Sequence, residues 1–407
     1  MYNNIIIRYG ELGLKGRNFS QFQQALLDDI ERRLSPYLKF NLQTTYGRIF
    51  IQPQENLESL SENMIRALKF TPGIVSFSPA VQLPADADLN LMTEKGIELI
   101  RKNSPEQDST LTFKVKTNRA NKEYPINSME INKKIGARVL KHFDDKTDYN
   151  LSVDVHDPEL MLEYDVRENG IFVFTKRYPG SGGLPAGSSE KALLLLSGGI
   201  DSPVAGWKVM RRGVEISNLH FHTPPYTGEK ALQKVRDHTR KLARYNGDTE
   251  LYTVNITDIQ KKIWSDCPRS YAITLLRRMM MRIASRLGKN INASGLVTGD
   301  SIGQVASQTL VSIRTISAAA SLPLLRPLLT DDKQDIISLA RELNTYSIST
   351  RPHEDCCTLF IPDNPITRPR LEKTEALEEE LPVKDMIEKA LNNVEKQTIS
   401  PDKYSSQ

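Results

Sequence analysis

The feature that most constrains this chain is a short apolar run that stops abruptly at a serine and two glycines. Residues 192–204 read ALLLLSGGIDSPV, and the four consecutive leucines indicate a strand that is buried on both faces. Ser197, Gly198 and Gly199 predict a tight loop, and a helix is expected after it with Ser202 as its N-cap. The segment therefore predicts a strand, a loop and a helix in immediate succession.

This loop suits a phosphate group, because glycines let the backbone approach a ligand and the N–H groups of a helix start attract an anion. Neither the Gly-Lys-Ser/Thr ending of the Walker loop nor the Gly-x-Gly-x-x-Gly dinucleotide fingerprint is present. The order Ser-Gly-Gly-x-Asp-Ser resembles the pyrophosphate loop of enzymes that split ATP into AMP and pyrophosphate. That resemblance implies that Asp201 helps hold magnesium-bound pyrophosphate and that Ser197 and Ser202 donate to phosphate oxygens. The alternative is an ordinary strand-turn-helix junction.

The first 80 residues predict a small β-α-β-β-α unit that a further strand closes. Its expected elements are strands at 4–9, 40–45, 48–52 and within 71–83, a helix that Ser20 caps, and a helix at 57–68. The pattern GELGLKGRN at 10–18 resembles the amino-terminal ferredoxin-like domain that is found beside tRNA-binding THUMP domains. The resemblance implies that Lys15 and Arg17 face RNA phosphate, and the alternative is a mere surface loop.

Residues 81–177 predict a second unit, with helices at 91–102 and 128–142 and strands at 110–117, 152–156 and 170–177. The first of these strands alternates apolar Phe113 and Val115 with lysines, so one face is expected to be core and the other cationic. The unit looks like a THUMP domain, which implies that it grips the acceptor end of tRNA through shape and phosphates. The expected tRNA contacts are Lys114, Lys116, Arg119 and Lys122. The alternative is a solvent-facing strand in a domain that binds nothing.

A Gly- and Pro-rich linker is expected at 178–190, and a catalytic domain at 191–370. In this domain strands (214–221, 251–256, 293–297) alternate with helices (228–245, a long stretch through 286, 335–343), which predicts a parallel sheet with its site at the strand carboxyl ends. His220 and His222 lie at such an end. Their spacing could suit a metal, but no third ligand is nearby, so their backbone is favoured as a wall of an adenine pocket and no metal site is predicted. A charged helix at 371–394 and a polar tail complete the expected chain.

Three further motifs widen the resemblance. With GDSIGQVASQTL, LLRPLLTDDK and RPHEDCCTLF, and with the two units before them, the chain is identified as a member of the tRNA 4-thiouridine synthetase (ThiI) family. The resemblance implies an α/β enzyme that uses ATP and Mg²⁺ to adenylate O4 of the uridine at position 8 of tRNA, after which persulfide sulfur displaces AMP. The implied ATP contacts are Leu195, Leu196, Ser197, Gly198, Gly199, Ser202, His220, Phe221, Arg277, Gly299 and Gln308.

The resemblance assigns activation to Asp201 and Lys333, with Lys333 stabilising charge on the transferring phosphoryl group. The alternative for Lys333 is a lysine at a helix start with no partner. The family aligns a functional cysteine with the adjacent pair Cys356 and Cys357, and spacing from Lys333 favours Cys356, with Cys357 as its neighbour or substitute. Cys267 matches no motif and is expected to be structural.

The resemblance implies tRNA and a cysteine desulfurase as partners, with delivery of sulfur either direct or through a separate carrier protein. No rhodanese cysteine follows residue 370, although longer members of the family carry one. That absence argues against the family's second role, sulfur supply for the thiazole of thiamine. A homodimer is a further hypothesis, because the RNA-binding unit of one subunit could be too far from its own active site.

Two other function classes compete with this interpretation. A pyrophosphate-loop synthetase acting on a small molecule or another RNA base is disfavoured by the two RNA-type units. A non-catalytic tRNA-binding protein is disfavoured by Asp201, Lys333 and Cys356.

The chain has no apolar run near the roughly 20 residues that span a bilayer and no cleavable signal, so no membrane partner is expected. Three cysteines without zinc-type spacing fit a reducing, cytoplasmic compartment.

Overall fold

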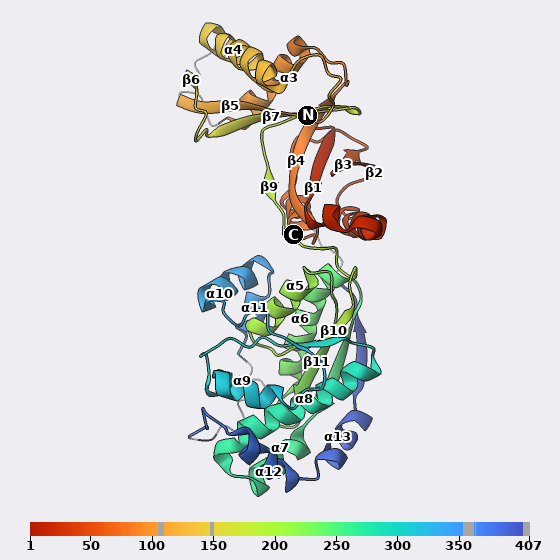
Figure 1. The fold of residues 1–407 in the computed structure, drawn as a ribbon, viewed down its shortest axis with the longest axis vertical. Coiled ribbons are helices and arrows are strands. Elements are labelled where there is room, and N and C mark those ends of the chain that lie inside the picture. Colours follow the sequence, from red (N-terminus) through yellow and green to blue (C-terminus); the bar gives the residue numbers. More distant parts are fainter. Residues whose placement is uncertain (105–109, 147–149, 353–361, 363, 402–407) are drawn as a thin grey trace. The chain divides into compact units, whose positions relative to one another are not determined.

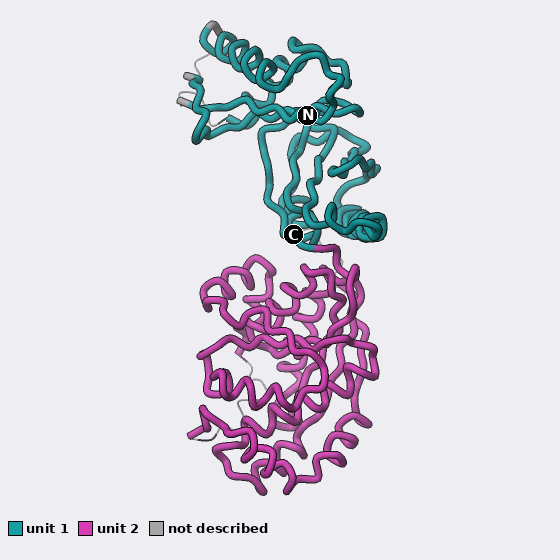
Figure 2. Tube along the Cα trace, viewed as in Figure 1, with its two compact units in different colours: residues 1–183 teal, residues 184–407 magenta. Residues whose placement is uncertain are grey.

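A computed structural model gives the fold and describes residues 1–104, 110–146, 150–352, 362 and 364–401. The chain divides into two compact units, Met1–Gly183 and Leu184–Gln407 (Figure 2). Within the described ranges, no helix is both long enough and apolar enough to cross a bilayer.

The first unit is one nine-stranded sheet with helices packed on it, in the strand order β2-β3-β1-β4-β8-β7-β5-β6 and with β9 added on β4 (Figure 1). Its first half contains β1 (Asn4–Tyr9), the 3-10 helices η1 (Glu11–Leu14) and η2 (Gly16–Asn18), α1 (Phe19–Leu34), β2 (Phe40–Thr45), β3 (Arg48–Pro53), α2 (Glu62–Lys69) and β4 (Ile74–Leu83). Its second half contains α3 (Leu89–Asn103), β5 (Thr110–Arg119), α4 (Ser128–Lys146), β6 (Asn150–Val153), β7 (Leu160–Arg167), β8 (Gly170–Phe174) and β9 (Tyr178–Pro179).

Strand β4 connects the two halves of this unit, because it is long enough to pair in both. Its first part pairs antiparallel with β1, where Phe77 lies opposite Ile7. Its last part pairs antiparallel with β8, where Val81 lies opposite Val173. The strand at the start of the expected linker, β9, also pairs with β4, so Tyr178 and Pro179 belong to the sheet.

The expected alternation of β5 is confirmed. Phe113 and Val115 are buried in a core that α3 and α4 cover, whereas the Lys116 side chain is exposed. Because successive side chains of a strand point to opposite faces, the sequence pattern was sufficient to assign the buried face.

Strand β7 was missed by the sequence analysis, and the reason is chemical. It carries two acidic residues, Glu163 and Asp165, that are buried. Each has a cationic partner: Arg177 Nη2 lies 2.7 Å from a Glu163 carboxylate oxygen, and Arg167 Nε lies 3.1 Å from one of Asp165. Buried carboxylates inside a strand are tolerated only with such partners, which local sequence does not reveal.

Two helix starts and one loop differ from the expectation. The helix α1 begins at Phe19 after Asn18 and has no side-chain cap, so Ser20 does not cap it. The helix expected at 57–68 begins only at Glu62, because Ser61 caps it by accepting a hydrogen bond from the Met64 N–H at 3.3 Å. The basic loop at 10–18 contains two short 3-10 helices.

The second unit is a six-stranded sheet in the order β14-β13-β10-β11-β12-β15, in which every pairing except that of β15 is parallel. Its first elements are β10 (Lys191–Leu195), α5 (Asp201–Met210), β11 (Glu215–His222), α6 (Glu229–Asn246), β12 (Thr249–Asn255), α7 (Thr257–Asp266), η3 (Arg269–Tyr271), α8 (Ala272–Asn290) and β13 (Gly295–Val297). The remaining elements are η4 (Ala306–Gln308), α9 (Leu310–Ser317), β14 (Leu324–Leu325), α10 (Lys333–Glu342), α11 (Tyr346–Ser349), α12 (Leu371–Glu379), α13 (Val383–Asn392) and β15 (Glu395–Ile399).

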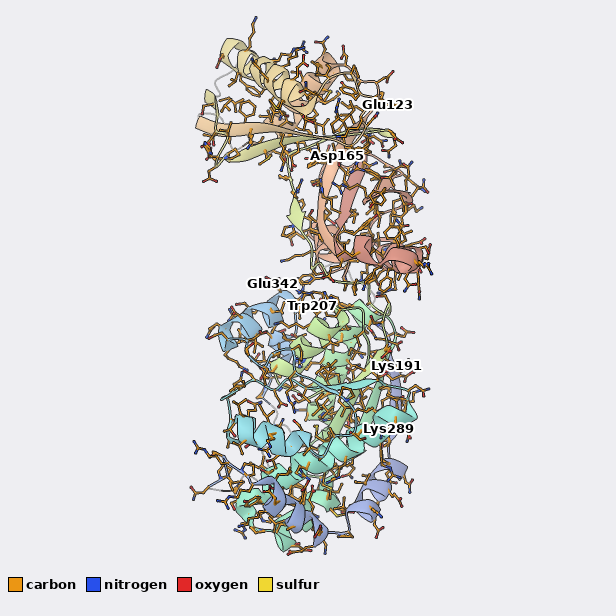
Figure 3. The ribbon with its side chains drawn as sticks, viewed as in Figure 1. Glu123, Asp165, Lys191, Trp207, Lys289 and Glu342 are labelled. Atoms are coloured by element: carbon orange, nitrogen blue, oxygen red, sulfur yellow. The ribbon has the colours of Figure 1, made fainter. Side chains whose placement is uncertain are left out.

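The central strand β10 is buried on both faces, as its leucine run predicts. Leu193 belongs to the core that α7 and α8 share with the sheet, and Leu194 faces α5, where a side chain at Gly206 would collide with it. On that second face, Trp207 of α5 (labelled in Figure 3) packs edge-on against Tyr245 of α6. The sheet is therefore covered by helices on both sides, so its strand ends are the place for a site.

The C-terminal region corrects the expectation of one helix and a polar tail. Two helices, α12 and α13, are separated at Pro382, and β15 follows as an antiparallel edge strand on β12. The fully buried Arg278 of α8 fastens α12, because its guanidinium donates to both carboxylate oxygens of Glu378 at 2.9 and 2.7 Å. The sequence EKQTI of β15 is almost wholly exposed, which explains why no strand pattern identified it.

Candidate active site

The loop after β10 is organised by two serine side chains. The Ser202 hydroxyl accepts a hydrogen bond from the Ser197 N–H at 3.0 Å, and the Ser197 hydroxyl accepts one from the Gly199 N–H at 3.1 Å. The helix α5 begins at Asp201 after Ile200, so Ser202 lies inside the first turn and is not the N-cap that the sequence predicted. Its hydroxyl serves the loop instead, since it closes the turn between the strand and the helix.

A cavity of about 240 Å³ opens between this loop and the carboxyl ends of β10, β11 and β13. Ten of the eleven residues expected to contact ATP line it, and so does Asp201; Gly198 is not among the lining residues. The expected residues that line it are Leu195, Leu196, Ser197, Gly199, Ser202, His220, Phe221, Arg277, Gly299 and Gln308. Residues of the same wall that the sequence analysis did not name are Leu219, Met280, Met281, Thr298 and Asp300.

Gly299 is required by a close approach inside the protein. A Cβ atom at this position would lie 2.8 Å from the backbone nitrogen of Ser202 and 2.9 Å from the carbonyl carbon of Asp201. The loop after β13 therefore packs directly on the start of α5. The sequence analysis named Gly299 only as an implied ATP contact and did not foresee this packing contact.

The two histidines at the end of β11 have different surroundings. His220 is buried, and its Nδ1 lies 2.9 Å from the carbonyl oxygen of Leu196. Burial lowers the pKa of His222, although Glu395 and Glu229 act in the opposite direction. Across the residues that the structure describes, no group of three or more His, Cys, Asp or Glu side chains is arranged to hold a metal ion.

An ion pair joins the loop side of the cavity to α10. Lys333 is the first residue of α10, and its Nζ lies 2.5 Å from Oδ1 of Asp201. Asp332 caps this helix by accepting a hydrogen bond from the Gln334 N–H at 2.8 Å. The alternative considered for Lys333, a lysine without a partner, is therefore wrong: the cap directs α10 so that its first side chain reaches the carboxylate of α5.

Asp300 is the centre of a second charged cluster, on the β13 side of the cavity. Arg277 Nη2 lies 2.6 Å from its Oδ1, and Arg326 Nε lies 3.1 Å from its Oδ2, to which the Thr298 hydroxyl also donates at 2.8 Å. Burial alone would raise the pKa of Asp300, but the two guanidinium groups and the hydrogen bonds hold it at about 2. The carboxylate is thus ionised and fixes the direction of Arg277. The sequence signals for Asp300 were its place directly after a buried strand and its position in the motif GDSIGQVASQTL.

Comparisons with known proteins agree over the whole chain. Residues 4–78 match the ThiI ferredoxin-like domain, residues 86–176 match the THUMP domain, and residues 187–383 match the family described as "Thiamine biosynthesis protein (ThiI)". A "Probable tRNA sulfurtransferase" of Halothermothrix orenii is 45% identical over 397 residues, which cover 97% of this chain and 98% of that protein. The chain belongs to the ThiI family of tRNA sulfurtransferases.

Two further comparisons support this membership. A "Probable tRNA sulfurtransferase" of Brevibacillus brevis is 43% identical over 98% of this chain and 97% of its own length. A crystal structure described as a 4-thiouridine synthetase–RNA complex with bound ATP has a TM-score of 0.84 and 36% identity, covering 98% of this chain and 100% of that one. The expected fold class is thereby confirmed: a ferredoxin-like domain, a THUMP domain and a parallel-sheet pyrophosphate-loop domain.

In this ThiI-family chain, the basic residues that we expect at tRNA lie in the first unit and differ in their contacts. The side chains of Arg17, Lys116 and Lys122 are exposed. Lys15 lies over the ring of Phe22, with Nζ 4.8 Å from its centroid. Two others make backbone contacts: Lys114 Nζ donates to the Val155 carbonyl at 2.7 Å, and Arg119 Nη1 donates to that of Tyr124 at 2.9 Å. Arg119 thus supports the turn after β5 in addition to any role at RNA.

Of the three cysteines in this ThiI-family chain, Cys356 and Cys357 lie outside the described residues. Cys267 is buried at the end of α7 in the core that α8 shares, and burial raises the pKa of its thiol. A buried thiol with a raised pKa is a poor nucleophile, which agrees with the structural role expected for Cys267.

Proposed function

We propose that this chain converts uridine 8 of tRNA to 4-thiouridine in two steps at the cavity beside the Ser197–Gly199 loop. In the first step O4 of the uridine attacks the α-phosphorus of ATP, the bond between the α- and β-phosphates breaks, and pyrophosphate leaves. In the second step the outer sulfur of a cysteine persulfide forms a bond to C4 and AMP leaves. A second thiol then attacks the inner sulfur, so the S–S bond breaks, the transferred sulfur stays on C4 as 4-thiouridine, and the two thiols end as a disulfide. The adenylation step is needed because a pyrimidine carbonyl oxygen is a poor leaving group, whereas adenylate is a good one.

The observation that carries this proposal is that the loop and Asp201 line one cavity, and that Lys333 is ion-paired with Asp201. Apolar side chains of β10, β11 and α8, among them Phe221 and Met280, form a wall that suits a purine ring. The loop and the start of α5 lie on the side that suits the phosphates, because the first amide groups of a helix lack intrahelical acceptors. We therefore place adenine at the apolar wall and the triphosphate at the loop.

Mg²⁺ fits this site as part of the ATP complex. Mg²⁺ in phosphoryl-transfer sites is usually held by one or two carboxylates together with substrate phosphates. Asp201 supplies a carboxylate beside the loop, and its ion pair with Lys333 engages Oδ1. Both carboxylate oxygens of Asp300, the other acidic residue of the cavity wall, are engaged by guanidinium groups. When bound, Mg²⁺ would neutralise phosphate charge, and we assign Asp201 as its protein ligand.

Lys333 is assigned to charge stabilisation during adenylation. Its position opposite Asp201 keeps an ammonium group at the mouth of the loop before ATP arrives, so no large rearrangement is needed at the moment of reaction. A cation held at the pyrophosphate side would stabilise the negative charge that develops as the α–β bond breaks.

Sulfur transfer is assigned to Cys356, with Cys357 as its neighbour or substitute, and the sulfur is expected from a cysteine desulfurase, directly or through a carrier. Binding of the tRNA is assigned to the basic residues of the first unit. A thiol that must stay reduced and a tRNA substrate fit a cytoplasmic enzyme.

The test uses the full chain with unmodified tRNA, Mg-ATP, cysteine and a cysteine desulfurase, and follows the near-ultraviolet absorbance of 4-thiouridine. We expect wild type and the control Cys267→Ser to thiolate tRNA and the double variant Cys356→Ser/Cys357→Ser to be inactive, with the single variants showing which thiol is essential. Thiolation by the double variant would contradict the sulfur assignment. ATP cleavage by wild type without thiouridine would leave the nucleotide site intact and reject the substrate or the sulfur donor.

A further inference from the structure

A buried serine outside the cavity lining contacts the phosphate-binding loop. The hydroxyl of Ser349, at the end of α11, lies 3.2 Å from the carbonyl oxygen of Gly199 and 3.2 Å from Nε2 of His238 on α6. His238 is fully buried and Ser349 is 9% exposed. Neither residue lines the cavity. The Ser349 hydroxyl also lies 3.1 Å from the carbonyl of Thr345, one turn earlier, so its single proton is shared between two carbonyl acceptors. With the ring proton on Nε2, His238 donates to the Ser349 oxygen and leaves the hydroxyl proton for these carbonyls. The Gly199 carbonyl is thus contacted by a side chain that would not touch a bound nucleotide.

Two further polar contacts hold the end of α11 against α6 beside the Ser349–His238 contact. Arg351 forms an ion pair with Asp237, which precedes His238 in the chain. Lys234, one turn earlier in α6, donates through Nζ to the Arg351 carbonyl at 3.3 Å. The Ser349 hydroxyl therefore belongs to a segment that several polar contacts hold in place, and it can act as a fixed point for the loop.

Fixing this carbonyl also fixes an N–H group. The peptide between Gly199 and Ile200 is planar and trans, so the Ile200 N–H points away from the Gly199 carbonyl and hence away from Ser349. It belongs to the first amide groups of α5, which have no intrahelical carbonyl to bind. Rotation of this peptide would turn a carbonyl oxygen toward the side where the phosphates are expected, and would repel them.

His238 suits this task because it is neutral. Burial lowers its pKa to about 4, although the Gly198 carbonyl beside the ring acts in the opposite direction. A neutral imidazole can exchange one hydrogen bond with the Ser349 hydroxyl and adds no charge behind the loop.

We propose that Ser349, held by His238, is a positioning residue for the phosphate-binding loop, which fixes the Gly199–Ile200 peptide and thereby sets the affinity for ATP. This inference rests on the proposed nucleotide site, but not on the identity of the base that is modified. It predicts that two residues without nucleotide contact control binding of the nucleotide.

The experiment measures the Kd of Mg-ATP by calorimetry, together with the thermal midpoint in the absence of ATP. Ser349→Ala is expected to raise the Kd about tenfold, the order of one lost hydrogen bond at a buried acceptor. The matched control is Ser347→Ala on the same short helix, where the side chain is exposed. Its Kd should equal that of wild type. Because the hydroxyl and the imidazole act as one unit, the double variant Ser349→Ala/His238→Gln should bind ATP no more weakly than the weaker single variant.

The inference is overturned if Ser349→Ala binds ATP like Ser347→Ala, or if it lowers only the thermal midpoint and leaves the Kd unchanged, since that is the behaviour of a residue with a merely structural role. Additive effects in the double variant would also overturn it. Direct binding separates this test from the proposed function: wild type that binds ATP but makes no thiouridine counts against the function alone, and wild type that does not bind ATP contradicts both.

Discussion

The two units arrange their charged side chains in opposite ways. In the second unit, the charges at the cavity are held in pairs before any ligand arrives, as in Asp201 with Lys333 and Asp300 with Arg277 and Arg326. In the first unit, three of the six cationic side chains expected at RNA are exposed at the surface and the other three are half-buried. The difference agrees with the two tasks: a reaction centre needs fixed geometry, whereas binding to a phosphate backbone needs positive charge spread over a surface.

The largest effect should come from breaking the Asp300 cluster. Asp300→Asn keeps the shape of the side chain but leaves two poorly exposed guanidinium groups without their carboxylate, so we expect a loss of about 3–5 kcal/mol in the free energy of unfolding, measured with urea. The control is Asp258→Asn, because Asp258 pairs with Lys389 at the surface with both side chains 70% exposed. That variant should lose at most about 0.5 kcal/mol. Equal losses in the two variants would remove the distinction between fixed and surface charges.

A second test addresses the pair at the loop. Lys333→Ala should lower the rate of AMP release at saturating ATP and tRNA by about 10²–10³-fold, because a preorganised cation no longer faces the departing pyrophosphate. Lys208→Ala is the matched control, since Lys208 pairs with Asp331 close to the same helix start. A comparable loss in the control would show that any ion pair near α10 has this effect, and the catalytic assignment of Lys333 would fail.

The buried imidazole behind the loop predicts a pH dependence of stability. The pKa of His238 is lowered by burial from 6.5 to about 4, so between these values the unfolded chain binds a proton that the folded chain does not. The stability that the neutral His238 imidazole contributes to the folded state is complete above pH 6.5 and is lost as the pH falls toward 4. From pH 7 to pH 5 the free energy of unfolding should fall by about 2 kcal/mol from this group. His238→Gln should remove that part of the slope, and an unchanged slope would contradict the assignment.

The smallest effects are expected in the first unit. Lys116→Ala and Lys122→Ala should each weaken tRNA binding only a few-fold and reduce the slope of log K against log salt by about 1. Lys384→Ala is a control from the second unit, with an exposed side chain on α13. A single lysine whose loss abolished binding would mean that the first unit also contains a preorganised site, and the comparison would have to be revised.

The sequence was informative where local chemistry decides the structure. The leucine run, the two glycines and Asp201 were sufficient to predict the loop, since their order fits few other junctions. The sequence also predicted that residues from several strands meet at one site, because the strands of a parallel sheet end at the same edge.

The elements and site residues that the sequence did not reveal are those whose structure depends on partners distant in the chain. β7 carries buried carboxylates, which need arginines from other segments, and β15 is a polar strand that exists because β12 offers an open edge. The family resemblance named Lys333, but only the capped start of α10 explains how it reaches Asp201. Ser349 belongs to none of the quoted motifs, and Asp300 lies in the motif GDSIGQVASQTL without a role assigned to it, because the importance of both residues arises from what they contact.

The most direct test of the account counts AMP and 4-thiouridine in the same reaction with purified tRNA, Mg-ATP and a sulfur donor. The account predicts one AMP for each 4-thiouridine formed, and the loss of both products in Asp201→Asn but not in Asp335→Asn, an exposed carboxylate in the first turn of α10. Formation of 4-thiouridine without AMP, or undiminished AMP release by Asp201→Asn, would contradict adenylation at this cavity.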